Sequence, residues 1–161
     1  WDRKGGGFLT RLADIFSENN IPLEIRIVGP KKNNIPSNPS FKYIGYLDKS
    51  KNIDSFVREV RSWHYGTLFS KAEAFGISNR ECLLLGVPVI CHDVGGISSS
   101  VPKSGFGKIF NPNPNPKIVY KWIMDSFNPY EKYIELRKKL LTKQNEFTWD
   151  ITVKNLKKIL L

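Results

Sequence analysis

The pattern that decides the fold is the apolar run Gly66-Thr67-Leu68-Phe69, then the polar loop Ser70-Lys71-Ala72-Glu73-Ala74-Phe75-Gly76-Ile77, then Ser78-Asn79-Arg80-Glu81-Cys82-Leu83-Leu84-Leu85. It predicts a short buried strand over 66–69 and a helix over about 78–85, which ends at Gly86. The next strand is expected in Pro88-Val89-Ile90-Cys91. Strand, helix and strand in this order are typical of a parallel βαβ unit.

The same alternation extends in both directions along the chain. Helices are expected over 5–19 and 53–60 and near 117–127, 130–146 and 149–160; further strands are expected over 23–28, 41–44 and 107–110. This order predicts an α/β fold, a Rossmann-like doubly wound parallel sheet covered on both faces, with C-terminal helices. Because such a unit begins with a strand, we expect one to lead into Trp1.

Ligands of doubly wound sheets bind beyond the carboxyl ends of the strands. Three polar or glycine-rich segments follow predicted strand ends, at 2–7, 70–78 and 92–98. We therefore expect these three segments to meet at one site.

Composition indicates a globular protein and excludes several other classes. The chain has 161 residues, enough for one domain, and 40% of them are hydrophobic, as in globular proteins. No apolar run approaches the roughly 18 residues of a membrane span. The two cysteines, Cys82 and Cys91, exclude a disulfide scaffold and are expected to be reduced core thiols of a cytoplasmic protein. With no CxxC, HExxH or histidine cluster, no metal site is expected.

The formal net charge is +10, which favours phosphate-bearing partners or an anionic membrane face. A frequent use of lysine would explain the same number without any partner. The basic stretches in 137–139 and 154–158 could contact nucleic acid, but their cations alternate with leucines at helical spacing, as on a solvated helix face.

The basic pair Arg3-Lys4 stands before Gly5-Gly6-Gly7 at the start of the first predicted helix. Two cations beside the free N–H groups of a helix N-terminus suit a diphosphate, and glycines let a ligand approach the backbone. The alternative is a solvated, flexible end of the chain.

Two glutamates stand out in the loop and helix that follow the strand at 66–69. Ser78 and Glu81 have the spacing of a capping box, so Glu81 could simply cap its own helix. Glu73 has no such local role, and it is either a solvated carboxylate or part of a site at the sheet edge. The N–H groups of residues 76–79 could receive an anion.

The neighbours His92 and Asp93 invite comparison with a catalytic triad. No serine or cysteine stands in a G-x-S-x-G elbow, and adjacent residues of a strand point to opposite faces, so triad chemistry is rejected. His64, beside Trp63 and Tyr65, is interpreted as structural.

An ordered series of motifs resembles the C-terminal, donor-binding domain of retaining GT-B glycosyltransferases of the group 1, or family 4, type. The series is Trp1-Asp2-Arg3-Lys4-Gly5-Gly6, Ile27-Val28-Gly29-Pro30, Tyr43-Ile44-Gly45-Tyr46-Leu47, the segment from Phe69 to Glu81, Gly86-Val87-Pro88-Val89-Ile90 and Asp93-Val94-Gly95-Gly96-Ile97. Its centre is the E-x7-E pattern of Glu73 and Glu81. One departure is Ser98-Ser99, where many members of the family have Pro-Glu.

The resemblance implies a role for each matching position. Arg3 and Lys4 match the pair that neutralises the donor's diphosphate, and Glu73 matches the glutamate near the transferred sugar; these three are the candidate catalytic residues. Glu81 matches the glutamate that binds the nucleotide ribose. The remaining donor-binding candidates are Phe75, Gly76, Ile77 and Ser78 beside sugar and phosphates, and Tyr46 and Leu47 near the base. The family implies no metal and no cofactor, the nucleotide-diphosphate sugar being a co-substrate.

The implied enzyme is a hexosyltransferase that acts without metal, and residues 1–161 would form its single nucleotide-sugar-binding domain. Since the family's fold has two Rossmann-like domains, the chain is expected to be a fragment or a half-enzyme, inactive alone, and an N-terminal domain would hold the hydroxyl acceptor. The expected location is cytoplasmic, with the inner membrane surface as a further candidate partner and no nucleic acid. The alternatives are a non-catalytic nucleotide-binding domain and a basic nucleic-acid-binding module.

Overall fold

The structure, a computed structural model, describes residues 1–29, 31–102 and 105–150. Its strands are β1 (Ile25–Val28), β2 (Phe41–Gly45), β3 (Gly66–Leu68), β4 (Val89–His92) and β5 (Gly107–Phe110). All pairings are parallel, in the orders β1-β2 and β3-β4-β5. The predicted strands therefore exist, with ends that shift by one or two residues.

The helices alternate with these strands as the sequence predicts, except between β1 and β2, where the structure has only a 3₁₀ turn. They are α1 (Gly6–Glu18), α2 (Ile53–Arg61), α3 (Ile77–Leu84), α4 (Ile97–Ser100), α5 (Pro116–Ser126) and α6 (Tyr130–Thr142), with 3₁₀ turns at Asp2–Lys4, Lys32–Asn34 and Gln144–Phe147. The sequence did not predict the short helix α4. Most of the helix predicted over 149–160 lies outside the described residues.

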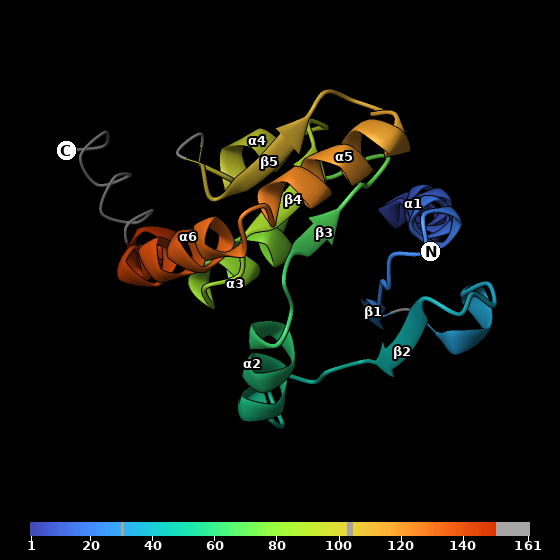
Figure 1. Cartoon of the computed structure of the whole chain (residues 1–161). Coiled ribbons are helices and arrows are strands. Elements are labelled where there is room, and N and C mark those ends of the chain that lie inside the picture. The colour runs from blue at the N-terminus through green and yellow to red at the C-terminus, as the bar shows by residue number, and fades with distance from the viewer. Residues whose placement is uncertain (30, 103–104, 151–161) are drawn as a thin grey trace.

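The central strand β4 is buried on both faces, which confirms the doubly wound arrangement. On one face, Val89 and Cys91 belong to a core cluster that includes Leu83 of α3 and Leu140 of α6. On the other face, Ile90 belongs to a cluster with α1 and α5, whose members include Phe8, Leu12, Phe16 and Val119. The alternation along β4 follows the period of two of a strand, and helices cover both sides (Figure 1).

The five strands form two sheets instead of one continuous sheet. In Figure 1, β1 and β2 lie apart from β3, β4 and β5. The side chain of Arg26 on β1 reaches the end of α2, where it donates to Glu59 at 3.1 Å and to Ser62, the residue after the helix, at 2.7 Å. In these orders β1 pairs with β2 alone and β3 pairs with β4 alone, so each of these two strands keeps one edge without a strand partner among the described residues.

Polar groups hold the helix α6 against the end of α2, the segment between α2 and β3, and the turn after α3. Arg137 donates to the carbonyl oxygens of Gly86, Trp63 and Arg61 at 3.0–3.1 Å. The Tyr133 hydroxyl donates to the carbonyl oxygen of His64 at 2.7 Å. The His64 ring packs edge-on to aromatic neighbours, and burial lowers its pKa. These contacts give His64 a structural setting.

Cys82 and Cys91 are buried and free, as predicted, and burial raises the pKa of each thiol to about 12. Both are therefore protonated and unreactive at neutral pH. Within the described part of the chain, none of the helices combines the length and apolar character needed to cross a bilayer.

Candidate functional site

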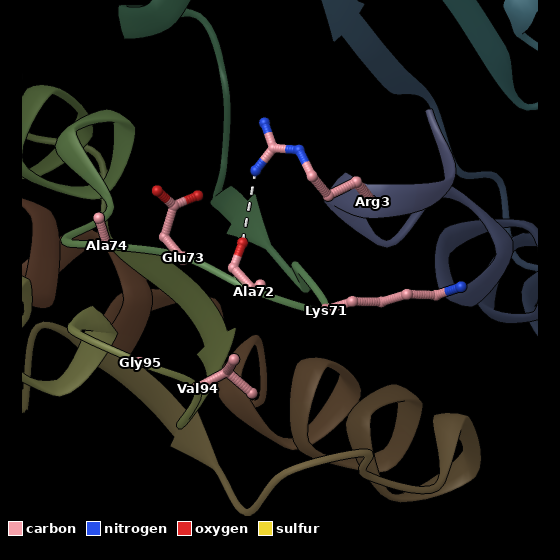
Figure 2. A pocket seen from close by; sticks show the side chains of 7 residues that line it. All are labelled: Arg3, Lys71, Ala72, Glu73, Ala74, Val94 and Gly95. Atoms are coloured by element: carbon pink, nitrogen blue, oxygen red, sulfur yellow. Dashed lines mark hydrogen bonds between the residues drawn. The ribbon is translucent and has the colours of Figure 1, made fainter.

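The three segments expected to meet do meet, in an open pocket of about 520 Å³ at the carboxyl edge of the sheet. Its lining comes from the turn before α1, the loop after β3 and the loop after β4: Arg3, Lys71, Ala72, Glu73, Ala74, Val94 and Gly95. Figure 2 shows Arg3 and Glu73 extending to the same side of the pocket, whereas the Lys71 side chain points away.

The basic turn at Asp2–Lys4 is held against the loop after β3. Gly5 has φ +82°, and a Cβ at this position would collide with the carbonyl oxygen of Phe69, so the turn needs glycine to come this close. The Lys71 N–H donates to the carbonyl oxygen of Arg3 at 2.9 Å, and the Lys71 ammonium pairs with Asp2 at 2.6 Å. These contacts fix where Arg3 and Lys4 stand.

Lys4 donates to the carboxylate of Glu73, whose side chain is 14% exposed. The hydrogen bond and charge of this ammonium hold the pKa of Glu73 below its usual range, with smaller contributions from the backbone N–H of Ala74 and then the charge of Arg3. The pair therefore stabilises the fold at neutral pH, and this stabilisation is lost as the pH falls below 4.5 and through the lowered pKa. The Arg3 guanidinium makes a long contact of 3.4 Å with the carbonyl oxygen of Ala72. Arg3 and Glu73 thus line the pocket, and Lys4, which is not one of the lining residues, is bonded to the Glu73 carboxylate.

The glycine pair after β4 supports the backbone of Glu73. The Gly96 N–H donates to the carbonyl oxygen of Glu73 at 3.1 Å. A Cβ on Gly95 would collide with this same oxygen, and one on Gly96 with the carbonyl oxygen of Ala74. The two glycines therefore let the two loops touch backbone to backbone.

The predicted capping box of Ser78 and Glu81 is wrong. The helix α3 begins at Ile77 after Gly76, which has φ +82° and serves as the N-cap without any side-chain cap. Ser78 consequently lies inside the first turn, where its hydroxyl is not at the capping position. The carboxylate of Glu81 pairs instead with Lys49.

Lys49 is a partner of Glu81 that the sequence did not reveal. Its ammonium bonds to Glu81 and lies 4.9 Å from the ring centroid of Phe56. This contact places the loop after β2, which also carries Tyr46 and Leu47, on the Glu81 side of the molecule. Within the run Asp48-Lys49-Ser50-Lys51, nothing in the pattern distinguishes Lys49 from its neighbours.

The other candidate donor-binding residues are not among the residues that line the pocket. Gly76 is buried, Ile77 is 54% exposed at the start of α3, and Ser78 is exposed. The Phe75 ring is 6.1 Å from that of Trp149. Tyr46 is 76% exposed and Leu47 is half-buried. Among the described residues, no group of three or more His, Cys, Asp or Glu side chains could hold a metal ion.

No protein-family model matches the sequence, and no curated protein matches it. Solved structures do match. Anabaena HepE in complex with UDP-glucose aligns over 99% of this chain and 46% of its own length, with a TM-score of 0.71 and 14% identity. The sucrose-phosphate synthase of Thermosynechococcus elongatus aligns over 99% and 43%, with a TM-score of 0.71 and 18% identity.

The chain has the Rossmann-like α/β fold of one part of the matching GT-B glycosyltransferase structures. The pneumococcal O-GlcNAc transferase GtfA, solved with UDP and GlcNAc, also matches, over 99% of this chain and 33% of that one, at a TM-score of 0.66 and 15% identity. The chain spans less than half the length of these solved structures. The likeness covers the Rossmann-like α/β architecture from end to end of this chain.

Proposed function

We propose that the chain is the donor-binding part of a retaining glycosyltransferase of the group 1 type, which transfers a hexose from a nucleotide-diphosphate sugar to a hydroxyl acceptor. The observation that carries this proposal is the meeting of Arg3 and Glu73 at one pocket beyond the strand ends, with Lys4 bonded to the Glu73 carboxylate. UDP-glucose or UDP in the matching solved structures supports a nucleotide-sugar donor.

Each group of the donor finds a chemically matched neighbour. Arg3 and Lys4 would bind the diphosphate and stabilise the negative charge that grows on it as the sugar leaves. Glu73, anionic because of Lys4, would accept hydrogen bonds from the sugar hydroxyls. The N-terminus of α3, with residues 75–78, would face the sugar and phosphates, Glu81 would accept from the ribose, and Tyr46 and Leu47 would lie near the base.

The proposed enzyme needs a second domain for its acceptor, as the matched structures are more than twice as long as this chain. The break between the two sheets supports a strand that leads into Trp1. In the doubly wound order 3-2-1-4-5-6, the first strand lies between the second and the fourth, which correspond here to β1 and β3. The proposed location is the cytoplasm, at or near the membrane surface if the acceptor is a lipid.

A thermal-shift screen of UDP-, GDP- and ADP-sugars tests the proposal. A donor present at about 100 times its Kd should stabilise the chain by about 2.7 kcal/mol. Selective stabilisation by one nucleotide is the expected result. Binding to any polyanion, with a steep dependence on salt, would instead support a basic nucleic-acid-binding module and refute the proposal.

The chain by itself is expected to bind the donor without transferring the sugar. The acceptor site is proposed to lie on the second domain, so no hydroxyl would be positioned for attack. Release of nucleoside diphosphate would be measured with purified chain, donor and a panel of sugar acceptors. Turnover that depends on the acceptor would contradict this expectation.

Chelation is expected to leave donor binding unchanged, because Arg3 and Lys4 would provide the positive charge that Mg²⁺ provides at other diphosphate sites. The affinity for UDP would be measured by calorimetry with and without EDTA. A large loss of affinity that Mn²⁺ or Mg²⁺ restores would show that a metal ion is required.

The substitution Glu81→Ala is expected to weaken nucleotide binding by roughly ten- to a hundredfold. Such a loss corresponds to about 1.5–3 kcal/mol, the range for hydrogen bonds to a charged group. The wild type should bind ribonucleotides better than 2′-deoxyribonucleotides, and the variant should not discriminate. Unchanged affinity in a folded variant would leave Glu81 only its pairing with Lys49.

A further inference from the structure

His92 is a buried titratable residue that the proposed chemistry does not use. It is the last residue of β4 and only 4% exposed. Its Nε2 is 2.7 Å from the carbonyl oxygen of Ser70, and its Nδ1 is 3.3 Å from the backbone nitrogen of Asn113. One ring thus joins the loop after β3 to the loop after β5.

The two partners fix the protonation of the ring. A carbonyl oxygen can only accept, so Nε2 must carry the proton and donate to Ser70. A backbone N–H can only donate, so Nδ1 must be unprotonated and accept from Asn113. The neutral Nε2–H tautomer satisfies both contacts, whereas an imidazolium would set its Nδ1–H against the N–H of Asn113.

The residue that His92 holds begins the loop of Glu73. Ser70 is fully buried, and its hydroxyl lies 3.5 Å from the Glu73 carboxylate. The next N–H along the loop, that of Lys71, donates to the carbonyl oxygen of Arg3. A shift of Ser70 would therefore move both the carboxylate and the basic turn.

We propose that His92, as the neutral Nε2–H tautomer, is a positioning residue that anchors the loop 70–74 and so sets the place of Glu73 opposite Arg3 and Lys4. The Gly96 N–H, which donates to the Glu73 carbonyl oxygen, is the second anchor from the β4 side. The consequence for donor binding rests on the proposed function; the anchoring itself does not.

The tautomer is tested on the unliganded wild type by ¹⁵N NMR of the imidazole. The sequence has only two histidines, so the signals of His92 and His64 can be assigned by substituting one of them. The expected spectrum shows a protonated Nε2 and an unprotonated Nδ1 for His92 at neutral pH. A protonated Nδ1 would overturn the proposal, and this measurement needs no variant of His92 that must fold.

The anchoring is tested by hydrogen exchange of the Lys71 amide in three variants. His92→Leu removes both contacts and should speed this exchange about five- to tenfold, the factor for one lost hydrogen bond. His92→Gln can place an amide N–H near the Ser70 oxygen and should restore slow exchange. Cys91→Ala, on the other face of the same strand, removes buried volume without touching this loop and should leave the exchange of Lys71 unchanged.

The functional consequence is tested with UDP-glucose and UDP as the two probes. Because Glu73 is proposed to face the sugar, His92→Leu should reduce the affinity for UDP-glucose relative to UDP, and His92→Gln should restore the ratio. A folded His92→Leu variant with wild-type exchange at Lys71 would overturn the anchoring. If the wild type binds neither probe, the proposed function fails. The anchoring is still decided by the hydrogen exchange of the Lys71 amide and by the tautomer of His92.

Discussion

Replacing both Arg3 and Lys4 by methionine is expected to weaken the binding of UDP by about a hundredfold or more. Hydrogen bonds to charged groups contribute about 1.5–3 kcal/mol each, and every 1.4 kcal/mol is about a factor of ten in Kd. Methionine keeps an apolar stem and removes the charge, together with the contacts that Arg3 and Lys4 make with Ala72 and Glu73. Uridine has no phosphate, so its affinity should not change. Calorimetry with both ligands measures the effect.

The matched control for this pair is Lys138→Met with Lys139→Met. Both residues are exposed on α6 and outside the pocket lining, so the control removes the same formal charge from another surface. Its affinity for UDP should stay within about twofold of the wild type, because exposed charges farther apart than the Debye length of about 8 Å are screened at physiological salt. Equal losses in the two double variants would mean that UDP responds only to net charge.

Local patterns predicted the elements of the fold well. The β5 strand was expected over 107–110 and has these bounds, because the turn residues on both sides of it interrupt the apolar run. Periodicity also predicted α1 and α5, each of which buries one face. The division into two sheets could not be predicted in this way, since it depends on which strands become neighbours across long stretches of sequence.

The part of the candidate site that depends on the course of the backbone was predicted from the sequence. Parallel strands end at one edge, and this rule brought Arg3, Glu73 and Gly95 together correctly. Side-chain pairing was less predictable. The capping box failed because Gly76, with its positive φ, starts the helix one residue earlier than expected. Lys49 was missed because its partner Glu81 is distant in sequence and nothing local marks the pair.

Two glycines fix the geometry of the site more strictly than its charged residues do. Glu73 is held where Gly95 and Gly96 let the backbone of one loop approach the backbone of another. No side chain can move aside to relieve a clash in such a backbone contact. In an ion pair, by contrast, another flexible side chain could take the place of a lost partner. The contact between these two loops should therefore be among the most sensitive features of the pocket to small substitutions.

Gly95→Ala is accordingly expected to lower the free energy of unfolding by about 2–5 kcal/mol, since the left-handed backbone costs an alanine about 1–2 kcal/mol and overpacking typically adds about 1–3 kcal/mol. Gly95 has φ +58°, and the new Cβ would meet the carbonyl oxygen of Glu73. The control is Gly105→Ala. Gly105 has φ +83°, and no atom lies within 4 Å of the new Cβ, so this variant should lose only the free energy that the left-handed backbone costs an alanine. Urea unfolding measures both variants, and UDP-glucose binding should weaken only in the first. Equal destabilisation of the two variants would show that the contact with Glu73 is not tight and that Gly95 is needed only for the positive φ of its turn.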